Sequence, residues 1–348
     1  MADLASFRAF ILTHGVALRI AGFAAAALLL VLLPSFASRS VLQDLFFVFT
    51  LLALAQYWNL LAGYAGLVSV GQQAFVGLGA YSLFAAVLIP GWDPLVGILL
   101  GGVVAGILAF PAALLVFRLR GAYFGIGTWV VAEVCRLVLA QVKALGGGTG
   151  TSLGPDITNH MFGVSWIAAL FGVRTPAARE IEVYWLALVL LLLTLALVFF
   201  LLRSRRGLAL AAIRDSEAAA VSLGVDSFRT RLSIYVIAAF GTGLIGALIY
   251  LQKARLSPDA GFSVLDWTAY VIFIVVIGGI GTIEGPIVGA VVLYFMQDYL
   301  AAFGTWYLMA LGALAAAVML VAPRGLWGYL VERFDVQIFP LRRRLLSK

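Results

Sequence analysis

Charged residues are the first thing that this sequence lacks. Asp, Glu, Lys and Arg make up 11% of its 348 residues, whereas about a quarter of the residues in a soluble domain are charged. Hydrophobic residues make up 64%, and several unbroken apolar runs approach or exceed the roughly 20 residues that cross a bilayer as a helix. The composition therefore excludes a soluble globular domain and predicts an all-α, polytopic transmembrane helical bundle.

Residues that carry catalytic chemistry are equally scarce. The single cysteine, Cys135, lies within an apolar run, so neither a disulfide framework nor a thiolate metal site is expected. His14 and His160 lie far apart in the sequence and predict no metal centre. No Gly-Lys pair occurs anywhere, which rules out the phosphate-binding loop G-x-x-x-x-G-K-[ST]. We predict that the chain is not an enzyme, that it binds no metal or cofactor, and that other subunits hydrolyse any ATP it depends on.

The apolar runs predict about ten spans within a single transmembrane domain, residues 1–348. We expect some Gly-rich spans to be broken or re-entrant, because irregular backbone inside a membrane is tolerated where it lines a cavity or is buried in protein. Residues 1–40 are expected to form an N-terminal segment with an uncleaved first span, and a secretory signal peptide is the alternative. The ten spans lie near residues 16–34, 41–61, 66–89, 94–117, 121–141, 183–202, 230–252, 267–283, 286–301 and 305–322.

Basic residues set the expected orientation, because Lys and Arg collect in cytoplasmic loops. With ten spans and an inner N-terminus, sixteen of the 23 basic residues face inward and six face outward, with Arg136 inside a span. Both termini are therefore expected to be cytoplasmic, including a basic tail at 323–348. This bias, together with attraction to anionic lipid, explains the net charge of +7 without a nucleic-acid partner.

The longest charged stretch, "RSRRGLALAAIRDSEAAAVSLGVDSFRTR" at 203–231, lies between two apolar runs. Asp215 and Ser216 suit a helix N-cap, "EAAAVSL" favours helix, and Gly224 suits a C-terminal stop. The pattern predicts a helix of about two turns outside the membrane, with Arg214 and Glu217 exposed near its start. A plain connector whose basic residues serve only topology is the alternative.

Several segments in order resemble one family. "GYAGLVSVGQQAFVGLGAYS", "RLRGAYFGIGT", "GGGTGTSLG", "RGLALAAIRDSEAAAVSLGVD" and "LSPDAGFSVLDWTAYVIFIVVIGGIGTIEGPIVGA" are similar to the LivM-type permease subunit of branched-chain amino acid ABC importers. Together they cover most of residues 57–300. Gln72 stands where this family often has His, and the segment after "GGGTG" diverges, so the transported solute is left open.

The resemblance implies a permease of the bacterial inner membrane that imports branched-chain amino acids, another amino acid or urea. It also implies a second related permease chain, two cytoplasmic ATP-binding subunits and an extracytoplasmic solute-binding protein. In such importers a short cytoplasmic helix rests on the ATPase, and Arg214, Asp215, Ser216, Glu217 and Gly224 would form it here. A self-contained ion-coupled secondary transporter is the alternative function; a membrane-embedded enzyme lacks any catalytic cluster in this sequence.

Glycines and polar residues recur in two segments, near 63–82 and 278–290. Small residues at intervals of three to four let helices approach closely in lipid, while Gly-Gly and Gly-Pro can break a span beside a cavity. Tight packing alone and a translocation pathway are both open explanations, and the polar side chains favour a pathway. The candidate pathway residues are Asn59, Ser69, Gln72, Gln73, Gly278, Gly279 and Gly281, with Gln56 one turn away.

Glu133 and Arg136 add a charged pair inside a predicted span. Three residues apart, they share one face of a helix. Ionised groups at membrane depth are costly and face a protein interior or a water-filled cavity. A mutually neutralised pair that holds helices together is one interpretation, and a place on the solute path is the other.

Overall fold

The computed structural model of the protein describes residues 22–300, 303–334 and 339. Within these residues the chain is mostly helical, as expected. The expected N-terminal segment up to residue 21 and the basic tail beyond residue 339 lie outside the described residues. The orientation of the termini therefore stays a prediction.

Seven helical stretches of the described residues are long and apolar enough to cross a membrane: Arg39–Tyr64, Pro94–Val116, Ala122–Leu139, Thr175–Arg203, Ser227–Lys253, Pro258–Gly278 and Trp306–Arg333. The other three of the ten expected spans coincide with shorter helices at Gly22–Ser35, Gln72–Leu88 and Glu284–Leu300. Each of these has 17 residues or fewer, so a count of ten crossings stays a prediction.

The helices follow one another along the chain with short connections. They are α2 (Arg39–Asn59), α3 (Gln72–Leu88), α4 (Pro94–Val116), α5 (Ala122–Leu139), α6 (Pro155–Thr158), α7 (Val164–Phe171), α8 (Thr175–Arg203), α9 (Arg205–Asp215), α10 (Glu217–Ser222), α11 (Ser227–Lys253), α12 (Pro258–Gly261), α13 (Tyr270–Gly278), α14 (Glu284–Leu300), α15 (Thr305–Val321) and α16 (Gly325–Phe334). Single π-helical turns extend α2 at Leu60–Tyr64 and precede α13 at Leu265–Ala269.

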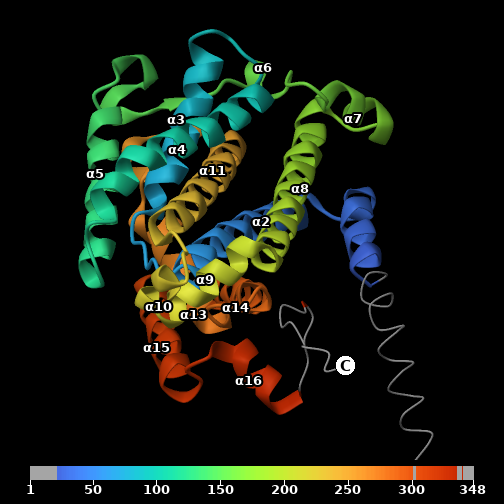
Figure 1. Ribbon diagram of the computed structural model, residues 1–348. Helices are drawn as coiled ribbons and strands as arrows, with labels where there is room; N and C mark the ends of the chain where they lie inside the picture. The colour runs from blue at the N-terminus through green and yellow to red at the C-terminus, as the bar shows by residue number, and fades with distance from the viewer. Residues whose placement is uncertain (1–21, 301–302, 335–338, 340–348) are drawn as a thin grey trace, which may run out of the picture.

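The centre of the bundle is the packing of α11 against α3 and α4 (Figure 1). Glycines make this contact close. A Cβ added to Gly79 of α3 would collide with the carbonyl oxygen of Gly243 on α11, and one added to Gly246 would collide with that of Val76. Helices without a hydrophobic drive to associate in lipid use such small residues to gain van der Waals contact. The glycine pattern near 63–82 is therefore at least partly a packing pattern.

One end of the bundle carries the charged segment. Figure 1 shows α9 and α10 beside α13 and α14 at this end, with α15 and α16 below them, while α6 and α7 lie at the opposite end. At that opposite end two short strands pair antiparallel, β1 (Thr151–Ser152) with β2 (Arg255–Leu256). The pairing, which the all-α expectation did not include, holds the Gly-rich loop 146–150 against the end of α11.

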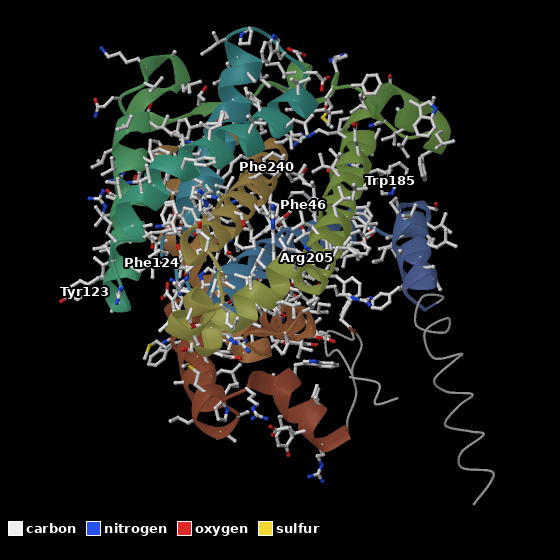
Figure 2. All side chains as sticks on the ribbon, viewed as in Figure 1. Phe46, Tyr123, Phe124, Trp185, Arg205 and Phe240 are labelled. Carbon is white, nitrogen blue, oxygen red and sulfur yellow. The ribbon has the colours of Figure 1, made fainter. Side chains whose placement is uncertain are left out.

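The sides of the bundle expose two helices. Figure 2 shows Tyr123 projecting from α5 away from the other helices, whereas the neighbouring Phe124 points inward and is buried. The N-terminal helix Gly22–Ser35 stands apart at the other edge (Figure 1). It meets α8 where the Tyr184 hydroxyl donates to the carbonyl oxygen of Leu30 at 2.8 Å and the Trp185 indole donates to that of Val31 at 3.1 Å.

Candidate functional site

The charged segment folds into two short helices rather than one. α9 ends at Asp215, and Ser216 then caps α10 by accepting a hydrogen bond from the amide of Ala219 at 3.3 Å. Gly224 ends the turn with φ +84°, a conformation that glycine adopts at no steric cost. The expected cap at Ser216 and stop at Gly224 are confirmed. The expectation that Asp215 could cap the helix is wrong, because it is the last residue of the preceding helix.

Glu217, at the start of α10, is tied to the first turns of α11. Its Oε1 accepts from the Ser227 hydroxyl at 2.6 Å and from the Arg231 guanidinium at 2.8 Å. These bonds, the Ser227 bond above all, lower the pKa of Glu217. The carboxylate form is therefore the bonded form at neutral pH, and the tether weakens only as the pH falls through that lowered pKa. About half of the Glu217 side chain is exposed, so the residue is less free than the sequence indicated.

Arg214 points the other way, toward the bundle. Its Nη1 donates to the carbonyl oxygen of Gly63 at 3.4 Å, in the π-helical turn that extends α2. A Cβ built on Gly281 would stand 3.7 Å from the same guanidinium, and one built on Gly63 would stand 2.6 Å from the backbone nitrogen of Gly281. The last turn of α9 therefore touches the place where the backbone of α2 meets that of the segment after α13.

That segment, Gly279–Ile283, interrupts the helical backbone between α13 and α14. Gly279 and Gly281 have φ of +136° and +77°, so the chain leaves α13 in a conformation that disfavours side chains with a Cβ. The Thr282 hydroxyl donates to the carbonyl oxygen of Gly279 at 2.9 Å and accepts from the amide of Gly285 at 3.0 Å. The expected break in the Gly-rich segment near 278–290 is confirmed.

Two side chains of α2 hold the break in place. Asn59 accepts from the Gly281 amide at 2.8 Å and donates to the Thr282 carbonyl oxygen at 2.7 Å. Gln56, one turn earlier, donates to the Ile283 carbonyl oxygen at 2.7 Å. Both side chains are fully buried. We call Gln56, Asn59 and residues 279–283 the hairpin clamp, since they satisfy backbone groups that a regular helix would have paired.

The polar residues near the start of α3 are buried between helices. Ser69 offers its carbonyl oxygen to the Trp58 indole at 2.8 Å, and Gln72 donates to the Leu54 carbonyl oxygen at 2.9 Å. Gln73 accepts from the hydroxyl of Thr268. Among the described residues, the side-chain oxygens of Gln72 and Gln56 have no hydrogen-bond partner. Their role in a pathway stays a prediction, and neither they nor the clamp line the cavity of about 790 Å³ beside the charged segment.

Glu133 and Arg136 form the predicted pair, and both lie within the candidate span Ala122–Leu139. Arg136 lies in the last turn of α5, donates to Glu133 at 2.6 Å and reaches Asp259 of α12 at 2.7 Å. The side chains of Glu133 and Asp259 are 43% and 85% exposed in this chain. Whether the pair holds helices together or lies on the solute path stays a prediction.

Two buried carboxylates were missed in the sequence. Glu182 of α8 is 7% exposed and has an oxygen without a partner among the described residues. Glu284, the first residue of α14, is 6% exposed and accepts from the amide of Phe339 at 2.8 Å. Glu182 stands one residue before the expected span 183–202, and α8 begins eight residues earlier than that span. In the described part of the chain no three acidic, His or Cys side chains gather to hold a metal.

Comparison with known proteins assigns the chain to a family. A family model described as "branched-chain amino acid transport system / permease component" matches residues 40–323. A branched-chain amino acid permease protein LivM of Salmonella typhimurium is 31% identical over 77% of this chain, and its Escherichia coli counterpart is 29% identical over 85%. The matches cover 65% and 77% of those relatives, so the chain spans just under two thirds of the first.

A more distant similarity reaches a sugar permease. A ribose import permease protein RbsC of Bacillus subtilis is 28% identical over 64% of this chain. No solved structure matches the chain. The LivM-type resemblance expected from the ordered motifs is therefore confirmed, and it covers the clamp, α5 and the charged segment alike.

Proposed function

Because the chain belongs to the permease-component family of branched-chain amino acid transport systems, we propose that it is a multi-pass subunit of an ABC importer in a bacterial inner membrane. Its solute is a branched-chain amino acid or a related small polar molecule, such as another amino acid or urea. A second, related permease chain completes a heterodimer. Two cytoplasmic ATP-binding subunits supply the energy, and an extracytoplasmic binding protein delivers the solute.

The contact of Arg214 with Gly63, whose backbone lies against the hairpin clamp, carries this proposal. An importer driven from outside the chain needs a segment that can be pushed by the ATPase and a segment that can change inside the membrane. α9 and α10 supply the first, and the break at residues 279–283 supplies the second. Arg214 touches the carbonyl oxygen of Gly63, whose backbone lies against that of Gly281. Movement of the charged segment is thereby delivered to the least regular backbone of the bundle.

The clamp also gives the movement two discrete end points. Asn59 and Gln56 bind backbone groups of residues 281–283, and each of these bonds is either made or lost. Packed interiors switch between such arrangements rather than deform gradually, so a small shift at an interface can be amplified. Releasing the clamp would free carbonyl oxygens toward the bundle interior, which is the kind of polar surface that solute paths use.

The test measures the coupling ratio of the reconstituted complex, which is the amount of solute taken up per ATP hydrolysed. We expect Arg214→Ala to leave capture of the ATPase subunits and basal ATP hydrolysis near those of the unaltered complex, because Glu217 and its tether are intact. Uptake per ATP hydrolysed should fall several-fold. Arg229→Ala is the matched control: Arg229 is 86% exposed and pairs with Asp226 on its own turn, and it should not change the ratio. An unchanged ratio in both variants contradicts the Arg214 route.

Buried Glu182 favours the second candidate function, an ion-coupled transporter that works alone. A buried carboxylate with an unpartnered oxygen is a possible ion or proton site. The two functions differ in what drives accumulation. Uptake that stops when a non-hydrolysable nucleotide replaces ATP supports the importer, and uptake by this chain alone under an ion gradient supports the alternative.

A further inference from the structure

A cavity lies beside the charged segment, and no role has been assigned to it so far. It has a volume of about 790 Å³, within the range of about 300–1,000 Å³ that is typical of small-molecule sites. Its walls come from the stretch before α3, the α4–α5 connection, the first turn of α5 and the α10–α11 region. We call it the loop cavity. It is distinct from the hairpin clamp, none of whose residues lines it.

The lining of the loop cavity is apolar with a few charged groups. Val68, Leu119, Phe124 and Phe228 are among its apolar residues, and Arg120, Arg231 and Glu217 are its charged ones. Mostly apolar walls with a small number of placed polar groups are the usual composition of a site for a small organic molecule.

Both arginines have capacity to bind an anion. Arg120 forms no ion pair with any described residue, although it lies near enough to Glu217 to favour the ionised carboxylate. Arg231 donates Nη1 to Glu217, and a quarter of its side chain is exposed. A carboxylate ligand between the two guanidinium groups would accept charge-assisted hydrogen bonds.

The charges suit a zwitterion better than a plain anion. A phosphate or a phospholipid headgroup would face the Glu217 carboxylate, which repels it. An α-amino acid presents a carboxylate to the arginines and an ammonium group to Glu217, and an aliphatic side chain finds apolar walls in Val68 and Leu119. Urea has neither the charges nor the apolar part.

We infer that the loop cavity is a second site for the transported amino acid, one with an apolar side chain, on the side of the ATPase. This inference rests on the proposed function. Glu217, Phe228 and Arg231 belong to the segment that the ATPase would move, so the shape of the cavity depends on the position of that segment. Ligand binding and segment position then influence each other reciprocally. Accumulated amino acid therefore restrains the segment and slows its own import.

Proteoliposomes that hold the complete importer, with ATP and a chosen concentration of L-leucine inside, test the inference. The measured quantity is ATP hydrolysis stimulated by the solute-binding protein outside. Hydrolysis should fall as internal leucine rises. Arg120→Gln should raise the leucine concentration for half inhibition about tenfold to a hundredfold, the loss expected for one charge-assisted hydrogen bond. Val68→Trp, which fills the cavity, should abolish inhibition without removing a charge.

Arg118→Gln is the matched control, because Arg118 is a neighbouring exposed arginine that does not line the cavity. Internal leucine should inhibit this variant as strongly as it inhibits the unaltered complex. Internal 4-methylpentanoate, which lacks the ammonium group, should inhibit more weakly than leucine. Each complex is compared with itself at zero internal leucine, so differences in assembly do not enter.

The outcomes separate the inference from the function beneath it. If vesicles loaded with ATP but no leucine import leucine, while internal leucine does not inhibit ATP hydrolysis, the cavity is not a leucine site and the importer function stands. Equal inhibition in Arg120→Gln, Val68→Trp and the unaltered complex also overturns the site. Inhibition that follows phosphatidylglycerol content instead of leucine reveals a lipid site and overturns the zwitterion. If vesicles loaded with ATP but no leucine hydrolyse ATP and import no leucine, the proposed function itself fails.

Discussion

Asn59 shows what a single residue contributes here. Its amide is the one side-chain group in the described chain that both donates to and accepts from the break after α13. An amide can do this because it carries a donor and an acceptor on one planar group. A leucine of similar size would leave the Gly281 amide and the Thr282 carbonyl oxygen buried without partners.

Asn59→Leu should therefore destabilise the chain by about 2–6 kcal/mol, since each of the two unpaired groups costs about 1–3 kcal/mol. We expect a lower melting temperature in detergent together with loss of uptake by the complex. Gln43→Leu serves as the control, because Gln43 lies on the exposed part of the same helix and makes one long bond of 3.4 Å. Normal stability of Asn59→Leu would show that water replaces the amide and that the clamp is open.

The glycines at the break differ in their surroundings, so we expect substitutions at each to have different effects. A Cβ on Gly278 would collide with the carbonyl oxygen of Gly285, a rigid backbone atom. Gly281 has room, with nothing nearer than 3.4 Å, but needs φ +77°. Gly278→Ala should thus prevent α13 and α14 from packing and abolish expression of folded protein. Gly281→Ala should cost about 1–2 kcal/mol, and Gly281→Asn less, since Asn tolerates the left-handed region.

Detergent-solubilised yield and melting temperature measure this order. Equal loss in Gly281→Ala and Gly281→Asn would contradict the conformational argument. Gly224, with φ +84° and nothing within 4 Å, is a control site outside the membrane where the same two substitutions should follow the same order.

At the scale of an element, α5 is the helix whose surroundings decide its role. Arg136 links its last turn to Asp259 of α12, and the three charged side chains are partly exposed in this chain. Exposed ion pairs contribute about 0–1 kcal/mol each, so Arg136→Ala should lower the melting temperature of the isolated chain only slightly. Removing the pair inside a covered interface costs more, about 2–5 kcal/mol.

The comparison of the isolated chain with the assembled complex is thus informative. If Arg136→Ala has only a slight effect on the isolated chain and on the assembled complex, the ion pair belongs to the exposed surface of the helix. A large loss of assembly or uptake with a slight loss of stability assigns it to a face that the second permease covers or the solute passes. Arg255→Ala, on the nearby strand β2, is the control for a charge at the same end of the bundle.

Elements were predictable from the sequence to the extent that their signals are local. The cap at Ser216 and the stop at Gly224 lie eight residues apart in one segment, and the apolar runs mark most helices. The bond between Asn59 and Thr282 joins residues 223 positions apart, so nothing near Asn59 indicates it. The same holds for the pairing of Thr151 with Leu256. The sequence singled out Asn59 as a polar residue for a solute path, whereas its hydrogen bonds to the backbone after α13 could be seen only in the fold.

At the scale of the whole molecule, the proposed function gives this chain a membrane path and a segment that receives movement, whereas its sequence has no phosphate-binding loop for ATP. Purified and reconstituted alone, it should therefore show no ATP hydrolysis and no accumulation of leucine against a gradient. Adding the ATPase subunits, the second permease and the binding protein should restore both. Radiolabelled leucine uptake and phosphate release measure the two activities, and concentrative uptake by the lone chain would contradict the importer.

The N-terminal helix Gly22–Ser35 is tied to α8 by two hydrogen bonds to its main chain. Tyr184 and Trp185 hold it by its carbonyl oxygens, and main-chain oxygens are present whatever side chains the helix carries. These two bonds place no requirement on the side chains of the helix, so we expect apolar substitutions there to be tolerated better than changes at Tyr184 or Trp185. A foreign apolar helix, supplied as a separate peptide, should therefore be able to replace it.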